Sequence, residues 1–105
     1  MKQFEVEIAE AAERDLEEIS DYIAYRLYNA SAALKLIREI QKAFDSLKTM
    51  PERQALVVDV YLAAKGLRVL PVANYLIFYR VRQEEAKVIV VRILYNRRAW
   101  ERILN

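Results

Sequence analysis

The spacing of the apolar residues changes twice along this chain, and the changes restrict the folds that the chain can adopt. Residues 4–8 alternate between apolar and acidic side chains, as a half-buried strand does. From about residue 10 to residue 47, apolar residues recur at the period of an amphipathic helix. Beyond Gly66 the chain becomes rich in Val, Ile, Leu and Tyr with short connections, which is typical of β-hairpins. This order predicts an α+β domain.

Two amphipathic helices are expected before residue 51. Asn29 or Ser31 can cap the second helix, and Pro51 ends it or follows its end. Because the joint between the helices is very short, they should form an antiparallel hairpin. The predicted apolar stripes are Leu16, Ile19, Ile23 and Leu27 in the first helix and Leu34, Ile37, Ile40, Phe44 and Leu47 in the second.

Three further strands are expected at residues 67–72, 75–81 and 88–94. Their connections are short enough for antiparallel hairpins. Residues 52–66 are weakly patterned, and we expect an extended segment or a loop there. A short helix should close the chain over residues 98–104. The sequence thus predicts one domain over residues 1–105, in the order β-α-α-β-β-β, with an antiparallel sheet packed on the helix hairpin and a short C-terminal helix.

Both faces of the expected sheet are largely apolar, although the helix hairpin can cover only one of them. We therefore predict that the second face binds a partner chain through apolar contacts and through salt bridges to its arginines. The alternative is that residues 52–66 and the C-terminal turn cover this face internally. The residues assigned to the second face are Leu76, Phe78, Arg80, Val90, Arg92 and Leu94.

The chain contains no cysteine and no histidine. Their absence excludes disulfides, thiolate and imidazole catalysis and nearly all structural zinc sites, so we expect no metal and no cofactor. No stretch approaches the roughly 20 apolar residues of a membrane span, and the acidic N-terminal residues lack the apolar core of a signal peptide. These features predict a cytoplasmic protein without a membrane partner.

The charge is spread unevenly between the two halves of the chain. Residues 1–52 carry seven Lys and Arg against eleven Asp and Glu, whereas residues 53–105 carry ten against four. Eight of the ten cations in the second half are arginines, whose planar guanidinium suits phosphate and carboxylate groups. This balance favours a nucleic-acid or acidic-protein partner, and the alternative is a solvated basic surface.

Three runs in the second half carry a resemblance to a known family. They are GLRVLPV at residues 66–72, NYLIFYRV at residues 74–81 and VVRILYNRRAW at residues 90–100. In this order and spacing they resemble the C-terminal half of RelE/ParE toxins, the toxin components of bacterial type II toxin–antitoxin systems. The resemblance implies a microbial-ribonuclease-like α+β fold, an acidic cognate antitoxin as partner and no small-molecule substrate. It also implies one of two targets, DNA gyrase or mRNA on the ribosome.

The chain departs from the family pattern at positions that matter for RNA cleavage. Tyr95 replaces the usual histidine, Ala99 replaces an aspartate, and Leu76 stands where ribosome-dependent nucleases have an arginine. The Lys-rich stretch of those nucleases is also missing, and its region offers only Arg53 and Lys65. These departures favour the gyrase-directed branch. The alternatives are a ribosome-dependent mRNA endonuclease and a non-toxic relic that still binds its antitoxin.

The candidate site residues cluster near the end of the sheet. Tyr95 can stack on a base or act as a phenolic acid beside cations, and with Arg97 it is a candidate for catalysis. The structural alternatives are closure of the sheet edge by Tyr95, a cross-strand pair with an acidic residue for Arg92, and a helix cap or a salt bridge to Glu101 for Arg97 and its neighbour. The predicted target- or phosphate-binding residues are Arg68, Arg92, Arg97 and Arg98.

Three tyrosines of the first helix, Tyr22, Tyr25 and Tyr28, lie off its apolar stripe. They are either a contact surface or side chains that pack over the flanks of the helix.

Overall fold

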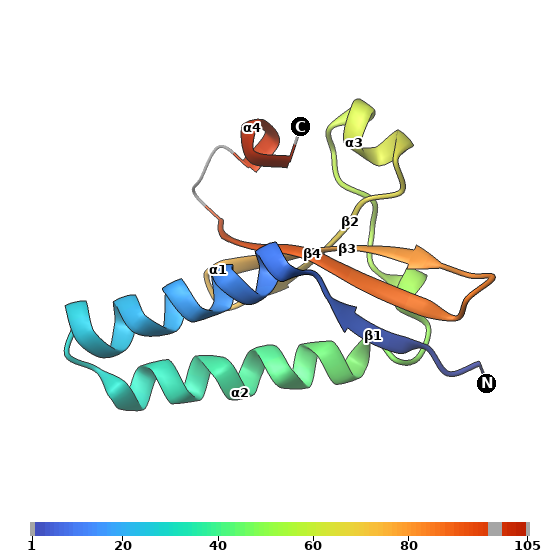
Figure 1. Ribbon diagram of the computed structural model, residues 1–105. Helices are drawn as coiled ribbons and strands as arrows, with labels where there is room; N and C mark the ends of the chain where they lie inside the picture. The colour runs from blue at the N-terminus through green and yellow to red at the C-terminus, as the bar shows by residue number, and fades with distance from the viewer. Residues whose placement is uncertain (1, 97–99, 105) are drawn as a thin grey trace.

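A four-stranded sheet separates a long helix hairpin from a smaller helical layer, as Figure 1 shows for the computed structural model of the chain. The structure describes residues 2–96 and 100–104. The elements are β1 (Glu5–Ile8), α1 (Glu10–Asp21), a π-helical turn (Tyr22–Arg26), α2 (Ala30–Ser46), a 3-10 turn (Pro51–Arg53), α3 (Val60–Ala64), β2 (Arg68–Val72), β3 (Tyr75–Arg82), β4 (Lys87–Tyr95) and α4 (Trp100–Leu104).

The strand order in the sheet is β1-β4-β3-β2. The last three strands pair antiparallel through hairpins, as the sequence predicts. The first strand adds to the sheet in parallel to β4, with Val6 opposite Val88 and Ile8 opposite Val90, so the complete sheet is mixed. Strands that pair in parallel need a long connection, and the helix hairpin with the segments after it supplies one here.

The helix hairpin packs on one face of the sheet (Figure 1). Asn29 caps α2, because its side-chain oxygen accepts a hydrogen bond of 3.0 Å from the backbone N–H of Ala32. Ile40, Phe44 and Leu47 are buried as predicted. At the start of α2, Ala33 and Leu36 are buried, whereas the predicted Leu34 is 49% exposed.

The end of the first helix differs from the predicted stripe. The helix widens into a π-helical turn, in which the N–H of Leu27 donates to the carbonyl of Tyr22. The wider turn changes the direction of the side chains that follow, and Leu27 is 55% exposed. Tyr22, Tyr25 and Tyr28 are also exposed, and Tyr28 has a left-handed backbone with φ of 51°. The tip of the hairpin is therefore rich in exposed aromatic rings.

A β-bulge in β4 places the residues before it on the faces opposite to those predicted. Tyr79 pairs with Val90 but Phe78 pairs with Arg92, so Val91 is an extra residue between the two pairs. As a result Val90 is fully buried on the helix side, and it does not belong to the second face as the strict alternation had placed it. Because of this extra residue, Leu94 after the bulge keeps its predicted face, whereas Val90 before it does not.

The prediction of an open second face is wrong. A second core cluster covers this face, formed by residues of β3 and β4, the segment before β2, and α3. Phe78 and Leu94 are buried there and Leu76 is partly buried, whereas Arg80 is exposed. The internal alternative is the one that the structure adopts. The cluster consists of Val57, Leu62, Leu67, Phe78 and Leu94, with Val69, Leu76, Val91, Trp100, Ile103 and Leu104 packed against it.

The segment before β2 also differs from the expected loop or extended chain, because Val60–Ala64 form α3. Asp59 caps this helix, since its carboxylate accepts a hydrogen bond of 2.9 Å from the N–H of Leu62. Leu62 of this helix is fully buried in the second core cluster. In contrast, Val58 and Val60 are 92% and 85% exposed.

Phe44 lies in the core that α2 shares with the sheet, and its removal should be costly. We expect Phe44→Ala to lower the free energy of unfolding by about 3–5 kcal/mol, because the lost transfer energy adds to that of the cavity. Chemical denaturation monitored by circular dichroism measures this change. Leu34→Ala is the matched control on the same helix and should cost well under half as much. Equal losses in the two variants would contradict the packing described here.

Candidate functional site

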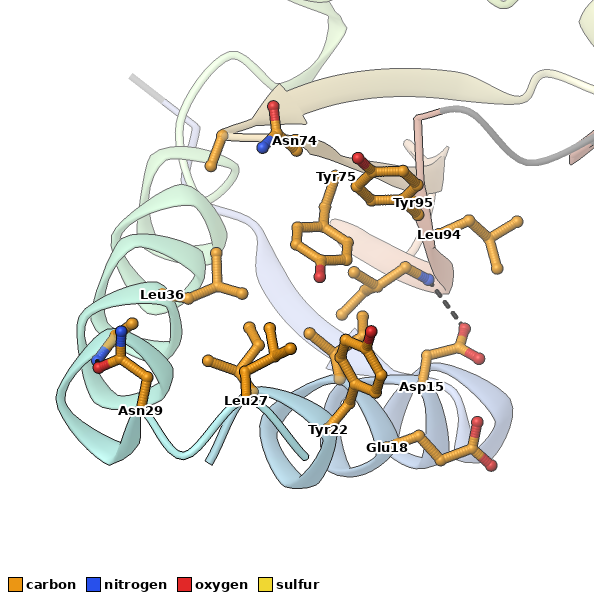
Figure 2. Close-up of a pocket in the computed structure, with 15 residues that line it drawn as sticks. Asp15, Glu18, Tyr22, Leu27, Asn29, Leu36, Asn74, Tyr75, Leu94 and Tyr95 are labelled. Atoms are coloured by element: carbon orange, nitrogen blue, oxygen red, sulfur yellow. Dashed lines mark hydrogen bonds between the residues drawn. The ribbon is translucent and has the colours of Figure 1, made fainter. Parts of the chain in front are cut away.

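The edge of β4 is the first feature of the site. The pairing between β1 and β4 ends at Val90, whose carbonyl accepts a hydrogen bond from the N–H of Ala9 as the chain turns into α1. Beyond this point Asp15 of α1 takes the place of a neighbouring strand. Its carboxylate accepts a hydrogen bond of 2.9 Å from the N–H of Ile93, as the dashed line in Figure 2 marks.

The same carboxylate forms a two-point ion pair with Arg92. The Nε and Nη2 atoms of Arg92 donate to the two oxygens of Asp15 at 2.7 and 2.8 Å. Asp15 is buried, and the Arg92 side chain is 27% exposed. The hydrogen bond with Asp15 raises the pKa of Arg92 above its usual value and outweighs the effect of burial. Arg92 thus pairs with an acidic residue, but the partner lies on α1 and not across the strands as the structural alternative expected.

Arg68 is also engaged within the chain. Its Nη1 atom donates to the carbonyl oxygens of Gln54 at 2.7 Å and Glu52 at 3.3 Å, and its Nη2 atom lies 3.4 Å from the carboxylate of Glu52. The same carboxylate accepts a hydrogen bond from the side chain of Gln83. Only 19% of the Arg68 side chain is exposed. Arg68 therefore fastens the segment after α2 to β2.

Tyr79 reinforces this attachment from the core. Its hydroxyl donates a hydrogen bond of 2.5 Å to the carbonyl of Pro51, and the residue is fully buried. Burial raises the pKa of Tyr79 to about 12, although Arg68 and Arg53 act in the opposite direction. The phenol is neutral at physiological pH and its role here is structural.

A groove of about 840 Å³ opens between the helix hairpin on one side and the start of β3 and the end of β4 on the other (Figure 2). Tyr75 and Tyr95 pair across the two strands and pack edge to face, with ring centroids 5.5 Å apart. In Figure 2 the hydroxyls of Tyr75 and Tyr22 point toward one another from opposite walls. The pKa of Tyr75 is raised by burial first, and then by the nearby Tyr95 and Tyr22. Asp15 and Glu18 contribute carboxylates to the lining.

The structure brings together only part of the predicted site. Tyr95 is 37% exposed on the rim of the groove. Arg68 pairs with Tyr79, whereas Tyr95 pairs with Tyr75 at the other end of β3, so Arg68 and Tyr95 are not neighbours. Arg97 and Arg98 lie outside the described residues.

Asp15 is the residue that the sequence reasoning missed. The sequence could have indicated a buried role for Asp15, because this residue lies between Ala12 and Ile19 on the side of α1 that faces the sheet. An acidic residue within an apolar stripe needs a partner, and such a partner is usually charged or a backbone N–H.

Within residues 2–96 and 100–104, no group of three or more acidic side chains is arranged to hold a metal ion. The same residues include no helix that is long and apolar enough to cross a membrane.

Residues 6–100 match the family model described as the ParE toxin of the type II toxin–antitoxin system parDE. No curated protein matches the chain. Among solved structures, a chain of the chromosomal ParDE toxin–antitoxin system from P. aeruginosa superposes with a TM-score of 0.71 at 21% identity, over 89% of this chain and 96% of that chain.

Two further complexes show the same fold. A chain of the RelBE2 toxin–antitoxin complex from Mycobacterium tuberculosis gives a TM-score of 0.62 at 20% identity, over 90% of this chain and 93% of that chain. A chain of the archaeal RelE-RelB complex from Pyrococcus horikoshii OT3 gives 0.60 at 13% identity, over 92% and 99%. The RelE/ParE-like α+β fold that the sequence predicts is confirmed.

Asp15→Asn should destabilise the domain, because the amide keeps one acceptor for Ile93 but removes the charge that balances Arg92. We expect the free energy of unfolding to fall by about 2–3 kcal/mol, less than for a fully buried pair because Arg92 reaches solvent. Urea denaturation measures this loss. Glu17→Asn on the exposed side of the same helix is the control and should change stability by less than about 0.5 kcal/mol. If Asp15→Asn unfolds at the same urea concentration as the parent chain, the ion pair contributes nothing to stability.

Proposed function

Since the chain belongs to the ParE toxin family of type II toxin–antitoxin systems, we propose that it inhibits growth by acting on DNA gyrase and that a cognate antitoxin neutralises it. The structures with a similar fold come from toxin–antitoxin complexes, which supports an antitoxin as the partner of this chain. The gyrase target rests on the parDE family and on the chemistry of the site.

The observation that carries the choice of target is the state of the predicted phosphate-binding arginines. Cleavage of RNA through the 2′-hydroxyl needs a base, an acid and free cations around one phosphate. Arg92 is held by Asp15, and Arg68 is held by Glu52 and Gln54. Of the predicted phosphate-binding arginines, the two that the structure describes are thus both engaged within the chain and are not free cations. A toxin that acts by binding a protein needs no such arrangement.

The second candidate function is ribosome-dependent cleavage of mRNA. It is favoured by the partly exposed Tyr95 at the end of β4 and by the shared fold with chains of RelE-type complexes. This function would need Tyr95 as the proton-handling group and Arg97 with Arg98 as the cations. A non-toxic relic that only binds its antitoxin is the third possibility, and a toxicity assay separates it from the other two.

The burial of the predicted antitoxin-binding residues reduces the set that we propose as direct contacts. Phe78 and Leu94 are buried in the second core cluster, so an antitoxin would have to displace the elements that cover them, whereas Leu76 is only partly buried there. Arg80 is exposed on the same face and can pair with an acidic antitoxin directly. Val90 is buried under the helix hairpin and is not proposed as a contact.

Controlled expression in bacterial cells tests the target, with plasmid supercoiling and protein synthesis measured separately. We expect plasmids to lose negative supercoiling before protein synthesis falls, and the purified chain to inhibit supercoiling by purified gyrase. Early loss of protein synthesis with cleaved mRNA and unchanged supercoiling would instead establish the nuclease. Growth that continues at full expression would identify a relic.

The site assignment is tested by replacing Arg97 and Arg98 together with alanine. We expect growth inhibition to be abolished at an unchanged soluble level, because guanidinium groups form strong charge-assisted contacts with a docked target. Arg82→Ala, which changes an exposed arginine paired with Glu85, is the control and should stay toxic. Tyr95→Phe should remain toxic against gyrase, whereas a phenolic acid in RNA cleavage would lose activity. Full toxicity of the double variant would contradict this assignment.

A further inference from the structure

Outside the helix hairpin, exposed apolar side chains gather at one place in the described part of the chain, the segment that leads into α3. Leu56, Val58, Val60 and Tyr61 are exposed within six consecutive residues, and Val58 and Val60 are 92% and 85% accessible to solvent. We call these four residues the α3 surface. Single exposed apolar residues are ordinary on a protein surface, whereas a group of them marks a site of contact.

The fold itself does not need apolar side chains at these positions. Val58 directly precedes Asp59, the residue that caps α3. An apolar residue at that position often packs against the fourth residue of the helix, here Ala63, but the exposure of Val58 shows that no such packing occurs. Val60 and Tyr61 occupy the first turn and also point away from the core. Polar residues would serve the structure equally well, so contact with another molecule explains the apolar ones better.

The α3 surface is held in place from both sides. Val57 is buried before it, and Leu62 is fully buried after it. The N–H of Leu62 donates a hydrogen bond of 2.9 Å to the carboxylate of Asp59. The Nζ atom of Lys65 lies 4.3 Å from the ring centroid of Tyr61 and helps to orient that ring. A partner would therefore meet a preformed surface and would not have to order a loop.

The position of the α3 surface separates it from the groove described above. In Figure 1, α3 lies on the opposite side of the sheet from the helix hairpin. None of its four residues lines the groove. A chain that occupies the groove leaves this surface accessible, so the surface is suited to a different partner.

Charge and size restrict the kind of partner. The carboxylate of Asp59 is engaged in the helix cap, whereas Lys65 is exposed and forms no ion pair among the described residues. One cation is too few for a nucleic acid, whose binding depends on many phosphate contacts. Four side chains are also too few for a stable pair of identical chains, which needs roughly 800 Å² and about 20–30 residues on each side. A small apolar projection instead suits a hollow on another protein.

We propose that the α3 surface is a contact through which this chain docks on its protein target, with Val58, Val60 and Tyr61 inserted into an apolar hollow and Lys65 facing a carboxylate at its rim. Tyrosine is among the residues that contribute most often to binding at protein interfaces. The proposal rests on the proposed function, under which the target is gyrase.

Photochemical crosslinking to purified gyrase tests the contact directly. p-Benzoylphenylalanine in place of Tyr61 should crosslink to gyrase on irradiation. The same group in place of Lys42, which is exposed on α2, is the control and should not. Equal crosslinking from both positions, or none from position 61 while supercoiling is inhibited, would overturn the proposal. A crosslink between two copies of this chain would identify a second copy as the occupant and also overturn it.

Variants measure what the contact contributes. Val58→Ser combined with Val60→Ser should raise the concentration that half-inhibits gyrase supercoiling about tenfold, because two apolar anchors are lost. Lys65→Glu should raise it about threefold or more, because the new carboxylate meets a like charge. Leu34→Ser removes an exposed apolar side chain of α2 and should inhibit as the parent does. All variants should unfold at the urea concentration of the parent chain. Parental inhibition by the double variant, or stronger inhibition by Lys65→Glu, would refute the surface.

Growth inhibition distinguishes failure of this proposal from failure of the gyrase target. If the parent chain inhibits gyrase and the double variant inhibits it equally, the surface assignment fails and gyrase stands. If the parent chain stops growth without affecting gyrase, gyrase fails, and loss or retention of toxicity in the double variant then decides the surface. A parent chain that affects neither growth nor gyrase overturns both. Sedimentation of the parent chain, but not of the double variant, with phosphatidylglycerol vesicles would assign the surface to a membrane and contradict a protein partner.

Discussion

The carboxylate of Asp15 supplies the acceptors that the edge of β4 lacks once β1 has ended. It receives the N–H of Ile93 and two donors of Arg92, so one buried side chain completes the sheet and balances a charge. This contact fixes α1 against β4 and thereby sets the helical wall of the groove that Tyr75 and Tyr95 line from the strands. An uncompensated carboxylate or guanidinium at this depth would cost several kcal/mol, so the two residues depend on each other.

Different elements cover the two faces of the sheet. The helix hairpin covers one face, and α3 with α4 covers the apolar part of the other, which leaves no bare sheet surface at Phe78 or Leu94 (Figure 1). Two of the arginines predicted as target residues, Arg68 and Arg92, hold the fold together. In the described part of the chain, the groove between the helix hairpin and the sheet and the exposed Arg80 remain accessible to other molecules.

Local patterns predicted most of this fold, and long-range contacts account for the rest. Helical and alternating periods identify α1, α2 and the last three strands because each buries one face of a regular element. The bulge at Val91 is invisible to a period-two pattern, and it moved Val90 to the opposite face. The helix α3 is too short to show a period, and the parallel pairing of β1 with β4 joins residues far apart in sequence. For the site, the family resemblance pointed to the arginines, but their partners Asp15 and Glu52 emerge only in three dimensions.

The amide of Ile93 reports most directly on whether Asp15 closes the edge of β4. Hydrogen exchange of this amide should be as slow as that of core amides in β3 and β4, because the hydrogen bond to Asp15 is released only when α1 leaves the sheet. In Asp15→Ala the same amide should exchange at least about a hundredfold faster relative to the other core amides. Rapid exchange of Ile93 in the parent chain, at the rate of an open sheet edge, would contradict the account.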